Sequence, residues 1–126
     1  MSVSHAVVWL DHQHAQILNP DAPEAPAVML HAHAYQTRQH GSRVRTEHEF
    51  FGAVCDALSK AGEILVTGGH TAQADFRHYV GKHRAALAPQ IAGWEILDRP
   101  TEAQLRVYAQ HYFRRHDRMT GDTPLR

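Results

Sequence analysis

Hydrophobic positions in the first third of this chain form short apolar runs and one alternating segment, and those in most of the remainder follow a helical period. Alternation predicts strands, apolar residues spaced three and four apart predict helices, and short apolar runs between helices predict buried strands. The expected strands are 5–10, 15–18, 27–34, 64–66 and 91–97, and the expected helices are 46–61, 72–87 and 101–116. The chain therefore has the predicted order β-β-β-α-β-α-β-α.

Two of the predicted helices begin with a capping box, in which a Thr hydroxyl and a Glu or Gln side chain each satisfy a free backbone N–H. The first box is Thr46 with Glu49, and the second is Thr101 with Gln104. Segment 35–45, before the first box, is polar and basic, and we expect it to be an exposed, mobile loop. Periodicity is lost from residue 117 onward, so a single domain over 1–116 and a flexible tail over 117–126 are expected.

Three consecutive strands followed by alternating helices and strands are typical of a mixed five-stranded sheet with helices on both faces. This order is the topology of the ribonuclease H-like three-layer α/β fold. Another three-layer α/β sandwich with a different strand order fits the same pattern, because periodicity does not define strand order.

The chain from Glu63 to Gln73 joins the central strand to the second helix through Gly68 and Gly69. A glycine turn at the start of a helix can bind phosphate, because the first N–H groups of a helix have no partner within it. A parallel strand also needs a tight turn into its crossover helix. A lone Gly-Gly is weak support for a ligand, so we interpret these glycines as a structural turn.

Composition indicates an ordinary soluble protein of 126 residues, with 13 basic and 13 acidic side chains. No apolar run reaches the roughly 20 residues that span a bilayer, and no signal-peptide pattern is present. The single cysteine, Cys55, lies in an apolar helical pattern and is expected to be a core residue in a reducing compartment. A cytoplasmic location is therefore expected. The count of twelve histidines is high for this length.

Acidic residues and histidines give two candidate chemistries. A ribonuclease H-like enzyme needs clustered carboxylates that hold two metal ions, for which the candidates are Asp11, Glu47, Glu49 and Asp98. The central strand ends without an acid, so the cluster is incomplete. Histidines two apart in a strand share a face, which makes His12, His14, His31 and His33 candidate metal ligands. No further Cys or His pattern completes a zinc site, so adventitious Zn²⁺ is the only cofactor considered.

Basic residues cluster locally although the total charge is zero. The candidate RNA-binding side chains are Arg38, His40, Arg43 and Arg45 in the loop, with Arg77, Lys82 and Arg84 on the second helix. Such side chains contact phosphates and give salt-sensitive binding. A third group, Arg106, Arg114, Arg115, His116 and Arg118, lies toward the end of the third helix. For Arg114 and Arg115, favourable interaction with the helix dipole is a sufficient interpretation.

Several segments resemble the middle domain of eukaryotic and archaeal class-1 release factors and of their relative Pelota. They are Ile64-Leu65-Val66-Thr67-Gly68, Ala72-Gln73-Ala74-Asp75-Phe76, Val8-Trp9-Leu10-Asp11-His12 and the run from Asp98 to Leu105. The whole chain resembles the small bacterial relatives of that domain often called translational machinery proteins. The resemblance covers nearly all of residues 5–116. It implies a ribonuclease H-like fold, association with ribosomes and a role in translation.

The chain departs from the release factors in one motif. Their Gly-Gly-Gln tripeptide, which promotes peptidyl-tRNA hydrolysis, lies between the third strand and the first helix. The matching segment 39–43 has the sequence Gln-His-Gly-Ser-Arg, and Gly68-Gly69-His70 matches the turn after the central strand instead. The resemblance therefore implies no peptide release by this route. Pelota also lacks the tripeptide and acts on ribosomes, so ribosome binding remains expected.

The leading hypothesis is a non-catalytic, cytoplasmic module that binds ribosomes or structured RNA. One alternative is a metal-dependent hydrolase or nuclease that uses Asp11 and nearby acids or histidines. Another is a homodimeric interaction protein that pairs through an exposed sheet edge. No membrane partner is expected.

Overall fold

The computed structural model describes residues 4–32 and 42–120, without the side chains of 42–44 and 119–120. Five strands, three α-helices and one 3₁₀-helix lie within these residues. The strands are β1 (His5–Leu10), β2 (His14–Leu18), β3 (Val28–His31), β4 (Glu63–Gly68) and β5 (Ile91–Ile96). The helices are α1 (Ser42–Leu58), α2 (His70–His83), the 3₁₀-helix η1 (Ala85–Gln90) and α3 (Glu102–Thr120). The expected order of strands and α-helices is confirmed.

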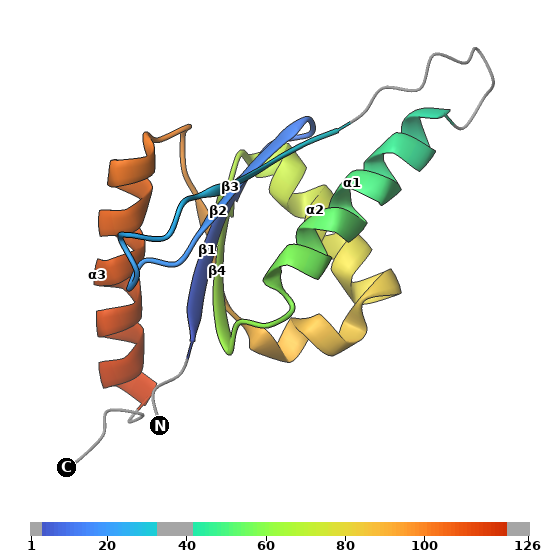
Figure 1. The fold of residues 1–126 in the computed structure, drawn as a ribbon. Coiled ribbons are helices and arrows are strands. Elements are labelled where there is room, and N and C mark those ends of the chain that lie inside the picture. The colour runs from blue at the N-terminus through green and yellow to red at the C-terminus, as the bar shows by residue number, and fades with distance from the viewer. Residues whose placement is uncertain (1–3, 33–41, 121–126) are drawn as a thin grey trace.

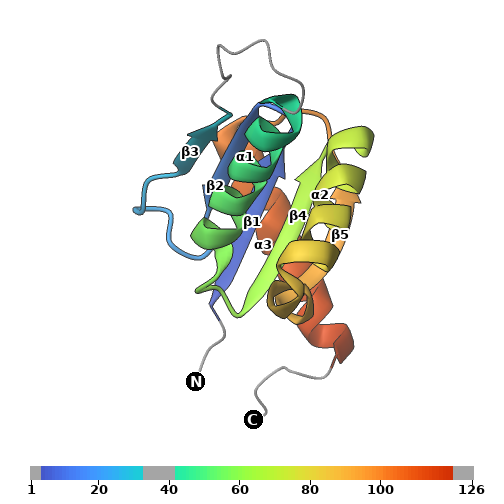
Figure 2. The same ribbon diagram turned by 90° about the vertical axis from the view of Figure 1, so that its right-hand side faces the viewer.

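The strands form one mixed sheet in the order β3-β2-β1-β4-β5. β1 pairs antiparallel with β2 and parallel with β4, and β5 extends the parallel half (Figure 2). Helices α1 and α2 cover one face of the sheet, and α3 covers the other (Figure 1). The predicted three-layer, ribonuclease H-like α/β fold is confirmed. The sheet-edge dimer stays a prediction, for which β3 and β5 are the two edges.

The alternation of side chains along the strands builds two hydrophobic cores, one on each face. In β1, Ala6, Val8 and Leu10 pack toward α1 and α2, whereas Val7 and Trp9 pack toward α3. β4 lies between β1 and β5, and its middle residues are buried on both faces. Buried parallel strands have continuous apolar sequences for this reason. Cys55 belongs to the first core and is buried, as expected.

The main differences between the predicted and the observed helix boundaries lie at three places. α1 begins at Ser42, one turn before the predicted start at Thr46. Thr46 and Glu49 lie inside the helix, where Glu49 accepts a hydrogen bond from Arg45 of the preceding turn. The predicted second helix divides at Arg84 into α2 and η1. The predicted capping box of Thr101 and Gln104 is present, with reciprocal hydrogen bonds of 2.9 and 3.1 Å.

The end of α3 is the third difference, because this helix continues through Asp117 to Thr120. The expected flexible tail from residue 117 is therefore wrong for residues 117–120, and residues 121–126 lie outside the described part of the chain. Within the described residues no helix is both long enough and apolar enough to cross a membrane.

Gly68 and Gly69 have different roles in the turn after β4. Gly68 has φ +151°, and a Cβ atom there would overlap the carbonyl oxygen of Leu10 on the neighbouring strand. Gly69 has φ −71°, and a Cβ atom there would meet no atom within 4 Å. The predicted structural turn is confirmed, and it depends on Gly68.

Candidate functional site

The C-terminal half of α3 carries a cluster of exposed basic side chains. His111, Arg114, Arg115 and Arg118 recur at intervals of three or four residues and line a shallow depression of about 260 Å³. Residues at this spacing lie on one face of a helix. Among the described residues, none of the three arginines forms a hydrogen bond or an ion pair. We call these four residues the α3 basic cluster.

The length of α3 changes the interpretation of this cluster. The helix dipole acts within about the last turn of a helix, and α3 ends at Thr120. Arg114 and Arg115 therefore lie more than a full turn before the C-terminus. The sequence pattern predicted a helix that ends near residue 116, so these arginines were interpreted as partners of the helix dipole. Their exposure without an acidic partner makes them available to a ligand.

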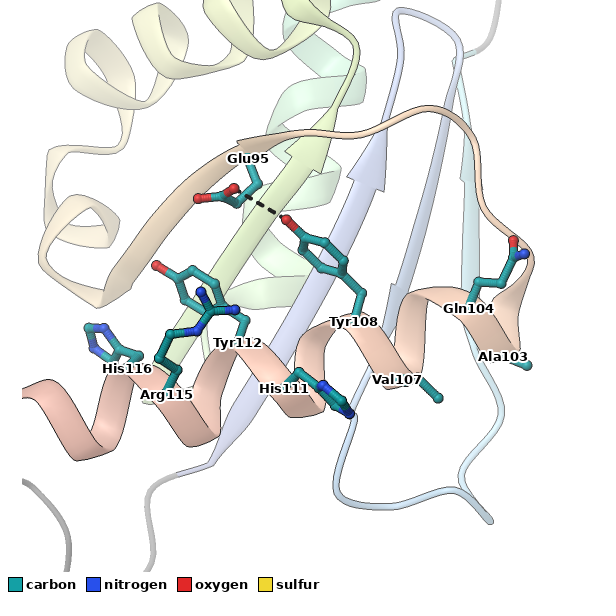
Figure 3. A pocket seen from close by; sticks show the side chains of 9 residues that line it. All are labelled: Glu95, Ala103, Gln104, Val107, Tyr108, His111, Tyr112, Arg115 and His116. Atoms are coloured by element: carbon teal, nitrogen blue, oxygen red, sulfur yellow. Dashed lines mark hydrogen bonds between the residues drawn. The ribbon is translucent and has the colours of Figure 1, made fainter.

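A groove of about 1090 Å³ lies beside the cluster, between α3 and the edge strand β5. Tyr108 and Tyr112 project from α3 toward β5, and Glu95 reaches toward them from β5 (Figure 3). The Tyr108 hydroxyl donates to Glu95 Oε1 at 3.2 Å, and the Tyr112 hydroxyl donates to the Ala92 carbonyl oxygen at 3.2 Å. Arg115 lines both the groove and the depression.

The electrostatics of the groove keep its tyrosines neutral. Partial burial raises the pKa of Tyr108 and of Tyr112, and the negative charge of Glu95 raises both further. The two phenols are therefore protonated at physiological pH. The groove presents uncharged aromatic rings together with the guanidinium group of Arg115. Proteins that bind single-stranded or looped RNA combine the same two elements, because bases stack on aromatic rings while cations contact phosphates.

Arg106 shows that a basic residue of α3 can also be structural. Its guanidinium donates to the carbonyl oxygens of Asn19 and Ala22 and to Glu102 Oε2. These bonds attach the loop after β2 to α3. The guanidinium group of Arg106 is therefore already hydrogen-bonded within the protein, unlike those of the α3 basic cluster.

The predicted RNA-binding side chains of segment 38–45 are only partly described. Arg38 and His40 lie outside the described residues, as does the side chain of Arg43 in the first turn of α1. Arg45 Nε lies 3.2 Å from Glu49 Oε2. RNA binding by this loop stays a prediction, because Arg45 is the one candidate side chain of the loop that lies within the described residues.

The basic residues predicted on the second helix, two in α2 and Arg84 directly after it, have different surroundings. The Arg77 guanidinium lies 5.0 Å from the ring centre of Trp94, a cation–π contact. Arg84 Nη1 lies 2.6 Å from Asp56 Oδ1, which raises the pKa of Arg84 chiefly through this hydrogen bond. Lys82 is exposed. Arg77 and Arg84 thus have structural contacts that the residues of the α3 basic cluster lack.

The histidines proposed as metal ligands are distributed over two places. His14 and His31 face each other across β2 and β3, with ring centres 5.1 Å apart. His14 Nδ1 is buried without a hydrogen bond and lies 3.4 Å from Asp11 Oδ1. His12 instead contacts Asp75 Oδ2 at 2.8 Å. His33 lies outside the described residues.

Among the described residues, the carboxylates proposed for nuclease chemistry do not form a group of possible metal ligands with one another. Asp11 Oδ1 accepts hydrogen bonds from the backbone N–H groups of Gln13 and His14, at 2.8 and 2.6 Å. Burial opposes ionisation, but these two bonds and the nearby His14 outweigh it, so the pKa of Asp11 is lowered. Asp11 therefore stabilises the hairpin, as a turn aspartate does. Potential ligand atoms of Glu47, His12 and Asp75 lie within 4.8 Å of one another.

Comparison with known proteins agrees with the fold. The solved structure of Pelota from Archaeoglobus fulgidus is similar to this chain, with a TM-score of 0.61 and 15% sequence identity. The similarity covers 97% of this chain and 34% of the Pelota chain, so this chain spans about a third of that protein. No family model matches the chain, and no curated protein matches it. The chain thus has a Pelota-like α/β fold.

Proposed function

We propose that this chain is a non-catalytic module that binds structured RNA, in particular ribosomal RNA, through the α3 basic cluster. The observation that carries the proposal is the exposed group of Arg114, Arg115 and Arg118 beside a groove with two neutral tyrosines. Arginines bind phosphate oxygens, and such contacts supply most of the affinity for nucleic acid. Because the net charge is zero, this attraction depends on a local cluster of basic residues and not on the total charge.

Two further observations support binding to ribosomes. The resemblance of the sequence to translational machinery proteins implies such a partner. The Pelota-like fold agrees with that resemblance over nearly the whole chain. Because fold does not define function, the role in translation is part of the proposal.

The described residues favour binding over covalent chemistry. The Cys55 thiol is buried, and this burial raises its pKa to about 11, so it has little thiolate at neutral pH. The carboxylate of Asp11 is occupied by backbone N–H groups of its own hairpin. Neither residue is arranged as a nucleophile or a general base.

Co-sedimentation with ribosomes across a salt series tests the proposal. The wild-type chain is compared with the triple variant Arg114→Ala, Arg115→Ala, Arg118→Ala. The matched control is Arg77→Ala, Lys82→Ala, Arg84→Ala, which removes the same charge from α2 and the residue that follows it. A third variant, Arg38→Ala, Arg43→Ala, Arg45→Ala, tests the loop predicted from the sequence.

We expect wild-type association at low salt, loss of most of it in the α3 variant, and near-normal association in the α2 control. Absence of wild-type association at low salt would refute the proposed function. Full binding by the α3 variant together with loss in the loop variant would instead assign RNA contact to segment 38–45. Circular dichroism of each variant verifies folding.

A second candidate function, metal-dependent hydrolysis, has one observation in its favour. Potential ligand atoms of His12, Glu47 and Asp75 lie close together, and His12 follows the C-terminal end of β1. Open α/β sheets bind ligands at the carboxyl ends of their strands. Hydrolysis of RNA or of a phosphodiester in the presence of Mn²⁺, lost in Glu47→Gln and Asp75→Asn, would support it. Equal cleavage by the wild type and both variants would reject it.

A further inference from the structure

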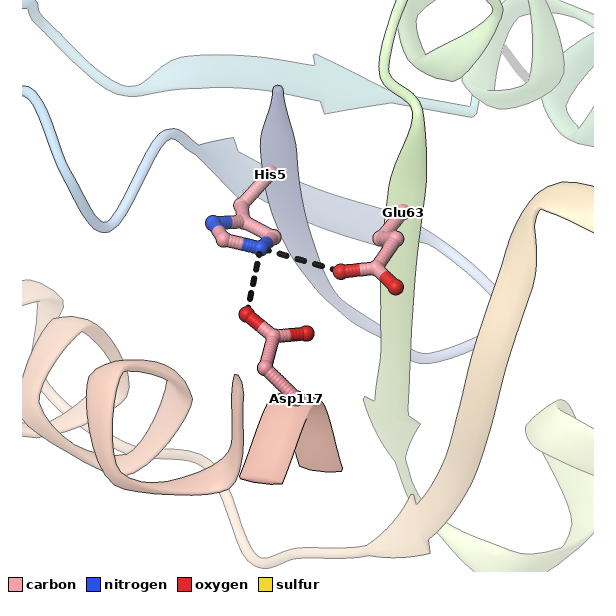
Figure 4. Close-up of side chains that lie close together, drawn as sticks. All are labelled: His5, Glu63 and Asp117. Carbon is pink, nitrogen blue, oxygen red and sulfur yellow. Dashed lines mark hydrogen bonds and ion pairs between the residues drawn. The ribbon is translucent and has the colours of Figure 1, made fainter. Parts of the chain in front are cut away.

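A second group of ionisable side chains lies at the opposite end of the parallel strands, where β1 and β4 begin. His5 and Glu63 are the first residues of these two strands and are direct neighbours in the parallel register. Asp117 approaches them from α3 (Figure 4). His5 Nε2 lies 3.0 Å from Glu63 Oε1 and 3.6 Å from Asp117 Oδ2. Carboxylates from two distant segments thus converge on one imidazole nitrogen.

The other side of His5 is fixed by the fold. Its Nδ1 lies 2.6 Å from Asp21 Oδ2, and its ring stacks on Phe113 with ring centres 4.2 Å apart. A hydrogen bond from Nδ1–H to a carboxylate defines the tautomer and directs the Nε2 lone pair outward. Histidines that bind metals have this same carboxylate partner on their second nitrogen. His5 is therefore oriented as a metal ligand is.

With its proton on Nδ1, a neutral His5 presents the Nε2 lone pair to two carboxylate groups, and this arrangement needs a proton or a cation between them. Glu63 and His5 are mostly shielded from water, with 16% and 13% of their side chains exposed, and Asp117 is 31% exposed. Placing two carboxylates together in a shielded site is costly because their charges repel each other. A divalent cation between the two carboxylates would attract both of them, and this attraction would offset their mutual repulsion.

The distances suit a small transition-metal ion. Two ligands that each lie about 2.1 Å from Zn²⁺ in a tetrahedral site are roughly 3.4 Å apart. The observed separations of 3.0 and 3.6 Å lie on either side of that value, and the ligand atoms of all three residues lie within 4.8 Å of one another. His116 Nε2, 3.5 Å from Glu63 Oε2, contacts the carboxylate oxygen that His5 does not.

We propose that His5 Nε2, Glu63 and Asp117 bind one Zn²⁺ ion, with water as the fourth ligand and with Asp21 and His116 orienting His5 and Glu63. An imidazole nitrogen among the ligands favours Zn²⁺ over Mg²⁺ or Ca²⁺, which prefer oxygen atoms alone. The ion joins the start of β1, the start of β4 and the last turns of α3. It thereby attaches the end of α3 to the sheet.

Zinc titration of the chelator-treated full chain against a chromophoric chelator tests this site. Glu63→Gln and Asp117→Asn each replace a ligand with an isosteric amide. Asp21→Asn changes only the residue that orients His5. The matched control is Glu47→Gln with Asp75→Asn, which alters the other group of possible ligands by the same chemistry. Substitution with Co²⁺ gives an independent readout, because visible absorption reports tetrahedral coordination.

We expect one tight equivalent of Zn²⁺ that raises the melting temperature of the wild type. Its affinity falls at least tenfold in Glu63→Gln and in Asp117→Asn, falls about 10-fold in Asp21→Asn, and is unchanged in the control. Equal Zn²⁺ affinity in the wild type, Glu63→Gln and Asp117→Asn would overturn the proposal, as would loss of the tight equivalent in the control alone. Asp117→Asn alters a partly exposed helix residue and keeps the test decisive if Glu63→Gln fails to fold.

Discussion

Tyr112 lies directly over Gly93, so that the tyrosine ring occupies the space a side chain on β5 would need. A Cβ atom at Gly93 would overlap the Tyr112 hydroxyl and come within 2.7 Å of Tyr112 Cζ. The Tyr112 hydroxyl donates to the carbonyl oxygen of the preceding residue, Ala92. Glycine on this strand thus allows the close contact between α3 and β5 that forms one end of the groove.

Gly93→Ala is expected to destabilise the protein by about 1–3 kcal/mol, because the added methyl group displaces a packed ring. Tyr112→Ala removes the clash, so the cost of the double variant should be less than the sum of the two single costs by at least about 1 kcal/mol. Urea unfolding of the wild type, both single variants and the double variant measures this coupling. Additive costs would contradict the contact.

The two glycines of the β4–α2 turn provide a matched pair. Gly68→Ala is expected to cost about 2–4 kcal/mol, because it combines an unfavourable positive φ with an overlap with the Leu10 carbonyl oxygen. Gly69→Ala should change the free energy of unfolding by less than about 1 kcal/mol, since its backbone is unstrained and the space is open. Chemical denaturation compares the two, and similar costs would show that the turn does not depend on Gly68.

Asp11 gives the hairpin a defined pH dependence. Its pKa is lowered in the folded state, so its contribution to stability is present above the pKa of an unfolded aspartate, about 4. The contribution is lost as pH falls through the lower folded value. Because Asp11 is partly exposed, we expect Asp11→Asn to cost only about 0.5–1 kcal/mol at pH 6 and less near pH 3.

Urea unfolding at the two pH values measures this difference, and Asp98→Asn is the control because Asp98 is exposed. A cost of Asp11→Asn that does not shrink between pH 6 and pH 3 would mean that the charge of Asp11 contributes nothing to the turn.

Cys55 should react slowly with thiol reagents in the folded protein. With its pKa raised from 9.0 to about 11, the thiolate fraction at pH 8 is about a hundredfold lower than that of a free thiol, and burial limits access further. Reaction with a chromogenic disulfide at pH 8, with and without denaturant, measures the ratio. Native and denatured rates within a few-fold of each other would contradict a buried thiol.

Much of the fold follows from local patterns in the sequence. The apolar run that follows His5 defines β1 with the bounds found in the structure, and the apolar run before Gly68 defines β4. The start of α1 was misplaced because a capping-box sequence also fits the exposed face of a helix interior. The end of α3 was misplaced because its last turns are polar, and polar residues carry no helical period.

The candidate sites were less predictable because they depend on contacts between distant residues. His5 and Glu63 are 58 residues apart and become neighbours only through the register of β1 and β4. Asp117 reaches His5 and Glu63 only because α3 extends past residue 116 and packs on the face of the sheet toward which the His5 ring points. One signal was present in the sequence: both parallel strands begin with a polar residue directly before an apolar run.

The salt dependence of binding to a structured ribosomal RNA fragment tests the central claim, RNA binding by the α3 basic cluster, most directly. Three phosphate contacts contribute about 2–3 to the magnitude of the negative slope of log affinity against log salt concentration. We predict that Arg114→Ala, Arg115→Ala, Arg118→Ala lowers the wild-type slope by about this amount, while the α2 control retains it. A slope unchanged by the α3 substitutions would contradict the account.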